Sequence, residues 1–195
     1  MLEVLELPGT SRGAFRHRAV FDGTELTVTY AVDPSEHDAR VAAGVGAFTN
    51  EFLLAALLTL SGKDLSPIEP RFERVLQAPD AACAATVIAD PDGGLWGQAR
   101  ARCVVDIIGI EISSSSLRRG CTLAHRWAGY GPRTVHSPRA ATAIDLTEAS
   151  HYGIGFVGSD GEYLLTPATF VAERWSSARW RFAELVYAQH RAQLD

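Results

Sequence analysis

Two kinds of apolar pattern divide the chain into strands and helices. Apolar and polar residues alternate on both sides of Asp22-Gly23, and this dipeptide favours the tight turn of a hairpin. Two stretches, about 38–61 and 167–192, instead carry apolar residues at helical spacing. We therefore expect a single α+β domain over residues 1–195, in which a mainly antiparallel sheet of about six to eight strands packs against these two long helices.

The longest run rich in β-branched residues covers 97–113 and is predicted to be one central strand. Side chains alternate between the two faces of a strand, so Asp106 and Glu111 are expected on opposite faces unless a bulge intervenes at Gly109. Each is a candidate active-site acid, and Asp106 stands out because valines and isoleucines flank it. The structural alternative is that Asp106 accepts hydrogen bonds from a neighbouring loop or pairs with an arginine.

The last predicted helix is apolar on two faces. Thr166-Pro167 has the residue types of an N-cap followed by the first helical position. A helix with two apolar faces is either buried on two sides or packs against another subunit. This pattern supports a non-catalytic interaction module as an alternative function, with a homodimer formed through Trp175, Trp180 and Tyr187.

The segment 118–139 is rich in arginine and histidine, and the glycines and prolines in its second half predict an irregular loop. Long loops inside compact domains often carry function, and arginines bind phosphate and carboxylate groups well. We therefore predict an enzyme, with a hydrolase among the classes considered, or a ligand-binding domain, acting on a small anionic substrate beside the central strand. The candidate anion ligands are Arg118, Arg126 and Arg133. The candidate acid/base groups are His125, His136 and His151, with Glu111 or Asp106 in support.

Charge and composition restrict the partners of the chain. The 195 residues carry a formal net charge of −5, with 47% apolar and 21% charged residues, as in ordinary globular proteins. The sequence shows no basic stripe, which disfavours nucleic acid as a partner. The longest apolar run, within 52–60, is far shorter than a membrane span, and no signal peptide is evident. We expect a cytoplasmic protein that does not insert into a membrane, and no motif identifies a cofactor.

The cysteines give no disulfide framework and no predicted metal site. Cys83, Cys103 and Cys121 are odd in number and widely spaced, so free thiols are expected. Cys121 and His125 have a spacing that could supply two zinc ligands from one helical turn. A structural zinc site normally shows two such pairs and the sequence has one, so no metal ligands are predicted.

The stretch Ile107–Ser113, with the sequence IIGIEIS, resembles the strand that carries Glu-x-Lys in metal-dependent nucleases of the restriction-endonuclease superfamily. In that family the motif ends a hydrophobic core strand, after a helix and an earlier strand that bears an aspartate. The resemblance covers roughly 70 residues and implies a nuclease-like core around Glu111. Ser113 stands where the family has lysine, and Lys63 lies elsewhere, so the implied relative is a degenerate one.

Overall fold

The computed structural model of the chain describes residues 3–5, 13–171 and 175–194. The chain forms two compact units: unit 1 holds the residues up to 31 and those from 106 to 173, and unit 2 holds 32–105 and 174–195. Helices and strands occur in both, which confirms the mixed α and β content expected from the sequence. None of the helices within the described ranges combines the length and the apolar character needed to cross a bilayer. The single domain expected over the whole chain stays a prediction.

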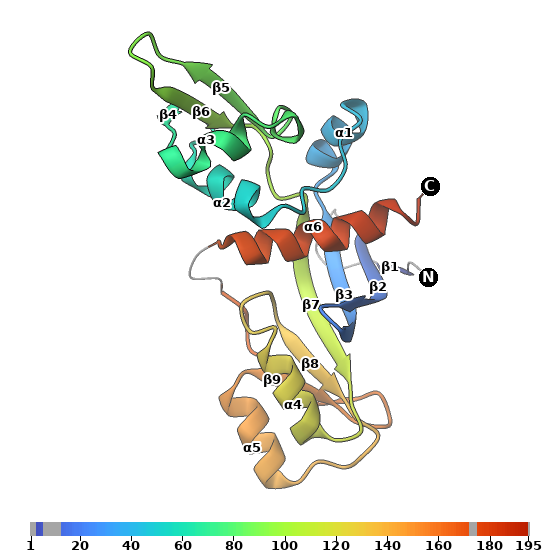
Figure 1. Ribbon diagram of the computed structural model, residues 1–195. Coiled ribbons are helices and arrows are strands. Elements are labelled where there is room, and N and C mark those ends of the chain that lie inside the picture. Colours follow the sequence, from blue (N-terminus) through green and yellow to red (C-terminus); the bar gives the residue numbers. More distant parts are fainter. Residues whose placement is uncertain (1–2, 6–12, 172–174, 195) are drawn as a thin grey trace. The chain divides into compact units, whose positions relative to one another are not determined.

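Unit 1 is built on a seven-stranded sheet with the strand order β1-β2-β3-β7-β8-β9-β10 (Figure 1). The strands are β1 (Glu3–Leu5), β2 (Ala14–Phe21), β3 (Thr24–Val32), β7 (Val105–Ser113), β8 (Arg133–His136), β9 (Ile154–Val157) and β10 (Tyr163–Leu165). β1, β2 and β3 form an antiparallel meander. The turn between β2 and β3 is the predicted hairpin, with positive φ at both Asp22 and Gly23.

The pairs β1–β2, β2–β3 and β9–β10 are antiparallel, as expected, but the middle of the sheet contains two parallel pairings that the sequence did not indicate. β7, β8 and β9 run in the same direction, connected through α4 (Leu117–His125) and α5 (Ala143–His151). α4 packs against β8 and α5 against β9, and the two helices contact each other (Figure 1). The close approach of α4 depends on Gly120, because an added Cβ would collide with the side chain of Val135 on β8.

The two faces of β7 have different surroundings near its end. Ile110 and Ile112 are buried, as is Val135, the register partner of Ile112 on β8. Val135 contacts α4 at Gly120, so this is the face that the helix covers. Glu111 and Ser113 point to the opposite face, because side chains alternate along a strand.

Unit 2 combines a small sheet with helices. Its sheet has the order β4-β6-β5, with antiparallel pairing throughout. The strands are β4 (Ser66–Pro67), β5 (Ala85–Ala89) and β6 (Leu95–Ala99), and the helices are α1 (Pro34–Ala42), α2 (Glu51–Thr59), α3 (Pro70–Leu76) and α6 (Ser177–Arg191). α2 contacts both α3 and α6. The apolar core of the unit includes Leu54, Leu57, Phe72 and Trp180.

Arg40 on α1 is the centre of a buried ion network in unit 2. Its guanidinium donates to Glu36 at 2.9 Å and to both carboxylate oxygens of Glu184 at 2.7 and 2.9 Å. Glu184 also accepts from the amide of Phe48 and the indole N–H of Trp180. Burial by itself lowers the pKa of Arg40, but the hydrogen bonds and charges of Glu184 and Glu36 outweigh it and raise that pKa. These groups satisfy one another, so the network serves the structure of the unit.

Neither of the long helices predicted over 38–61 and 167–192 forms as one element. The first stretch breaks because Gly44, just past the end of α1, adopts positive φ, and α2 then starts from its own cap at Asn50. The last helix starts from the cap at Ser176 and not from Thr166, so α6 is shorter than predicted. In both stretches the capping residues, and not the longer apolar pattern, determine where the helix begins. Residues 172–174 of the predicted helix lie outside the described residues.

The predicted central strand over 97–113 is two strands in different sheets. β6 ends at Ala99 and β7 begins at Val105. Between them the carbonyl of Ala84 accepts from the amides of Arg100 and Ala101, which ends the ladder of the small sheet. The region 128–140 was predicted as a loop but contains β8, because four strand residues are too few to show alternation. The helix α5 was not predicted either.

Candidate functional site

The parallel strands of unit 1 end at one edge of the sheet, and a cavity lies there. Ser113, His136 and Val157 are register neighbours at the ends of β7, β8 and β9. In parallel sheets ligands bind beside the carboxyl ends of the strands, where the connecting loops meet. This cavity, which we call the serine-lined cavity, has a volume of about 490 Å³. Its lining residues are Ser113, Ser114, Ser115, His136, Ser137, Pro138, Gly158 and Ser159.

His136 is the one histidine in the described lining of this cavity, and it contacts Glu111. Its Nε2 atom lies 2.9 Å from Oε2 of Glu111. The same carboxylate oxygen accepts a 2.6 Å hydrogen bond from Nη2 of Arg16. The hydrogen bond to Glu111 raises the pKa of Arg16, so the guanidinium stays charged and balances the carboxylate. His136 is therefore held by a carboxylate whose charge is already paired.

Two polar atoms at the cavity have no hydrogen-bond partner among the residues that the structure describes. One is the buried Oγ of Ser114. The other is Nε2 of His136, whose approach to Glu111 is close but is not aligned as a hydrogen bond. Nε2 faces Glu111, and the side chain of Ser114 packs against Gly120 of α4. The imidazole nitrogen that a ligand can engage is therefore the other one, Nδ1.

Strand geometry places Glu111, Ser113 and His136 on one face of the sheet. Residues two apart on a strand share a face, and so do register partners on neighbouring parallel strands. Glu111 can therefore orient the imidazole while Ser113 lies beside it at the end of β7. A histidine held by a carboxylate and open to a cavity can accept a proton and return it. The surrounding hydroxyls can hydrogen bond to the oxygen atoms of a small ligand.

His125 and His151 lie at the opposite edge of the same sheet. α4 and α5 connect parallel strands and must run back along them, so their last residues reach the amino ends of β8 and β9. Both imidazole rings pack edge-on against Tyr152, with ring centroids 4.3 Å and 5.0 Å from it. The three histidines that the sequence suggested as one set therefore form two separate groups.

The three arginines predicted to hold one anion lie in different places. Arg118 is exposed in the first turn of α4, beside the loop that lines the cavity. Arg126 donates to the β2–β3 hairpin at 3.4 Å. Arg133 donates to the carbonyl of Tyr152 at 2.8 Å, and burial lowers the pKa of Arg133. Arg118 is thus the one of the three that lies near the serine-lined cavity.

Asp106 does not line this cavity. It is exposed near the start of β7, whereas Glu111 lies near the end of the strand. The apolar surroundings expected for it are absent, because the buried face of β7 changes along the strand. Val105 and Ile107 are buried near the start, whereas Ile110 and Ile112 are buried near the end.

The surroundings of Glu111 differ from those that the nuclease resemblance implies. Within the described residues, no group of three or more His, Cys, Asp or Glu side chains is placed to hold a metal ion. β2 and β3, which precede β7 in the order of the sheet, contain no aspartate. Cys121 is buried in α4, and burial raises the pKa of its thiol to about 11, which suits a packing role. A degenerate nuclease core stays a prediction that this geometry does not strengthen.

Two of the three aromatic residues suggested for a homodimer surface are buried inside unit 2. Trp180 donates its indole N–H to Glu184, and Tyr187 is fully buried with its hydroxyl 3.1 Å from Nδ1 of His37. Trp175 is 45% exposed, but it precedes α6. Residues of the same chain thus cover the second apolar stripe of this helix. The stripe therefore gives no support to the homodimer hypothesis.

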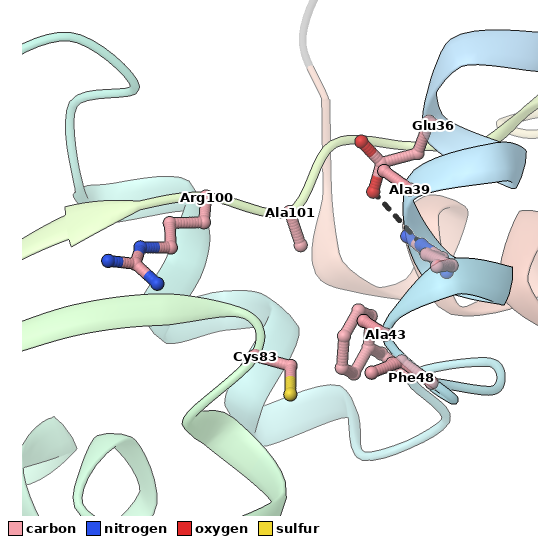
Figure 2. A pocket seen from close by; sticks show the side chains of 9 residues that line it. Glu36, Ala39, Ala43, Phe48, Cys83, Arg100 and Ala101 are labelled. Carbon is pink, nitrogen blue, oxygen red and sulfur yellow. Dashed lines mark hydrogen bonds and ion pairs between the residues drawn. The ribbon is translucent and has the colours of Figure 1, made fainter.

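One of the cavities in unit 2, with a volume of about 170 Å³, is shown in Figure 2. Its buried charges, Glu36 and Arg40, are bonded to each other, as the dashed line marks. Cys83 and Arg100 lie on the side away from α1, and Arg100 directs its guanidinium away from Glu36. The rest of the lining is apolar, namely Ala39, Ala43, Val45, Phe48 and Ala101. This cavity therefore offers fewer free polar groups than the serine-lined cavity.

Sequence reasoning named Glu111 and His136 as site residues, noted Ser113 as the position where the nuclease family has lysine, and did not select Arg16. The serines had a visible signal, because a run of serines directly follows an apolar strand and precedes a helix. No local sequence signal indicated Arg16, because its contact partner Glu111 lies 95 positions away in the chain.

Comparisons with known proteins assign no family to the chain. No family model matches it, and neither a curated protein sequence nor a solved structure gives a significant match. What the chain does is therefore inferred from the chemistry of its own side chains.

Proposed function

We propose that unit 1 binds a small anionic molecule in the serine-lined cavity and that His136 acts on it as an acid/base group, as in a hydrolase. The observation that carries the proposal is the 2.9 Å contact between His136 and Glu111 beside this cavity. Glu111 orients the imidazole and stabilises it when it is protonated. Arg16 keeps the carboxylate in place through its 2.6 Å hydrogen bond.

The start of α4 favours a negatively charged ligand. Ser116 caps the helix directly after the serines that line the cavity. The amides of a first helical turn carry partial positive charge and attract anions. The first turn of α4 contains no acidic residue and includes Arg118 and Arg119. The local field therefore suits a carboxylate or a phosphate.

The reaction that these groups support is hydrolysis of a small anionic ester. Neutral His136 takes a proton from the attacking hydroxyl or water and passes it to the leaving oxygen. The hydroxyls of the exposed lining serines, Ser113, Ser115 and Ser159, are available to the polar atoms of the substrate. Acid/base catalysis of this type contributes roughly 10²–10⁴-fold to the rate.

Turnover of two chromogenic esters, mono-p-nitrophenyl succinate and p-nitrophenyl phosphate, tests the proposal. We expect wild type to hydrolyse at least one of them, and His136→Gln to lower kcat/KM by about 100-fold or more. The matched control His125→Gln, at the opposite edge of the sheet, should retain wild-type rates. Absence of hydrolysis of both esters by wild type, or equal rates in wild type and His136→Gln, would contradict it.

A further inference from the structure

Ser113 lies next to the acid/base pair in a way that the proposed function does not yet use. Ser113 and His136 are register partners on neighbouring parallel strands, so their side chains share a face. Adjacent strands are about 4.8 Å apart, which brings a serine hydroxyl within reach of an imidazole through side-chain rotation. Both residues line the serine-lined cavity, and Ser113 is exposed there. Glu111, two residues earlier on β7, contacts the same imidazole.

We infer that Ser113 is the nucleophile of a Ser113–His136–Glu111 triad whose substrates are carboxylic esters of small anionic acids. The inference rests on the proposed function and specifies its chemistry. Nucleophile, base and orienting carboxylate are recognised by their mutual geometry, not by their order in the chain. Here the three residues lie on two adjacent strands and are separated in the chain, so they form no local sequence motif.

The lining of the cavity favours acyl over phosphoryl transfer. Phosphoryl transfer relies on metal ions and several cationic side chains around the transferred group. The described lining consists of hydroxyls, glycine, proline and one imidazole. Acyl transfer needs a nucleophile, a base and donors for the oxyanion, and a serine hydroxyl can be such a donor. The exposed hydroxyl of Ser159, in the same lining, is the candidate.

The reaction proceeds in two balanced steps. Oγ of Ser113 attacks the ester carbonyl carbon, and its proton moves to His136 while the hydroxyl of Ser159 donates to the oxyanion. The bond to the alcohol oxygen then breaks, His136 returns the proton to that oxygen, and an acyl ester remains on Ser113. Water next attacks the acyl ester and gives one proton to His136, which returns it to Oγ of Ser113 as the acid leaves.

Labelling with diisopropyl fluorophosphate tests the assignment, because this reagent phosphorylates activated serines with loss of fluoride. We expect one adduct by intact mass, mapped to Ser113 and absent from Ser113→Ala. The labelling rate should fall by about 100-fold or more in His136→Gln, as expected for loss of a general base. Ser115→Ala, which changes another serine of the lining, should be labelled at the wild-type rate.

Three results would overturn the inference: no adduct on wild type, an adduct at another serine, or unchanged ester turnover in Ser113→Ala. If Ser113→Ala keeps turnover and His136→Gln loses it, His136 takes a proton from a water molecule that attacks the ester directly, and the proposed function survives. Ser113→Cys provides a second probe that conserves size. Its thiol should react with iodoacetamide faster than the thiol of the Ser113→Cys/His136→Gln double variant, and equal rates would count against the triad.

Discussion

His190 shows how burial alters the protonation of a single side chain. It is buried on α6 in unit 2. Burial, followed by the charges of His37 and Arg191, lowers the pKa of His190 from its ordinary value of 6.5. In the folded protein this imidazole therefore stays neutral at pH values at which it would be protonated in the unfolded chain.

The free energy of unfolding is predicted to fall as the pH drops below 6.5, in part because of His190. Above this value His190 is neutral in both states and adds no pH dependence. Below it His190 binds a proton in the unfolded state before it does so in the folded state. The free energy of unfolding therefore decreases until the pH reaches the pKa of His190 in the folded protein. Urea unfolding at about pH 7.5 and about pH 5.5 measures the loss. Between these two pH values the free energy of unfolding of His190→Gln should fall less than that of wild type. The control His125→Gln, which changes an exposed histidine, should show the same fall as wild type. Equal falls in wild type and His190→Gln would contradict the prediction.

At the scale of elements, α4 positions the loop that lines the cavity. The helix begins at Leu117, directly after the serines of the lining, and packs on β8. Its contact depends on Gly120, which is buried against Val135. A glycine inside a helix normally lowers its stability by about 1 kcal/mol relative to alanine, so packing must explain its presence here.

Gly120→Ala is predicted to lower the free energy of unfolding by about 1–3 kcal/mol, the usual cost of overpacking. A decrease in the free energy of unfolding would be informative, because replacing glycine by alanine in an exposed helix normally increases it. Gly129→Ala is the control in the same unit, since an added Cβ there meets no atom within 4 Å. Urea unfolding of both variants measures the difference. A stabilised Gly120→Ala protein would show that α4 does not approach β8 this closely.

Elements with strong local signals were predictable from the sequence, and those that depend on distant partners were not. Asp22-Gly23 defined its hairpin. The long helix over 38–61 was wrong because Gly44 and the cap at Asn50 divide it. β8 is too short for its alternation to be visible, and its parallel pairing with β7 leaves no local trace.

At the scale of the molecule, the topology of the sheet determines which of the candidate histidines and carboxylates lie close together. The sequence identified these residues but not their neighbours. The pattern of β7 predicted that Glu111 and Asp106 would not form a paired-carboxylate site, and Asp106 is exposed near the start of the strand while Glu111 lies beside His136. It could not predict that His136 joins Glu111 while His125 and His151 lie at the other edge of the sheet. That division follows from the two helical crossovers, because each helix returns from the carboxyl ends of the strands to their amino ends.

The imidazole ¹⁵N signals of the six histidines, followed by NMR during titration with succinate and with inorganic phosphate, test the central site most directly. His136 should shift in a saturable way with at least one of these anions, because its ring borders the serine-lined cavity. His125 and His151 should stay in place, since they pack on Tyr152 at the opposite edge. The Glu111→Gln variant should change the starting signal of His136. Unmoved His136 signals with both anions, or larger shifts at His125 and His151, would contradict an anion site at the carboxyl ends of β7, β8 and β9.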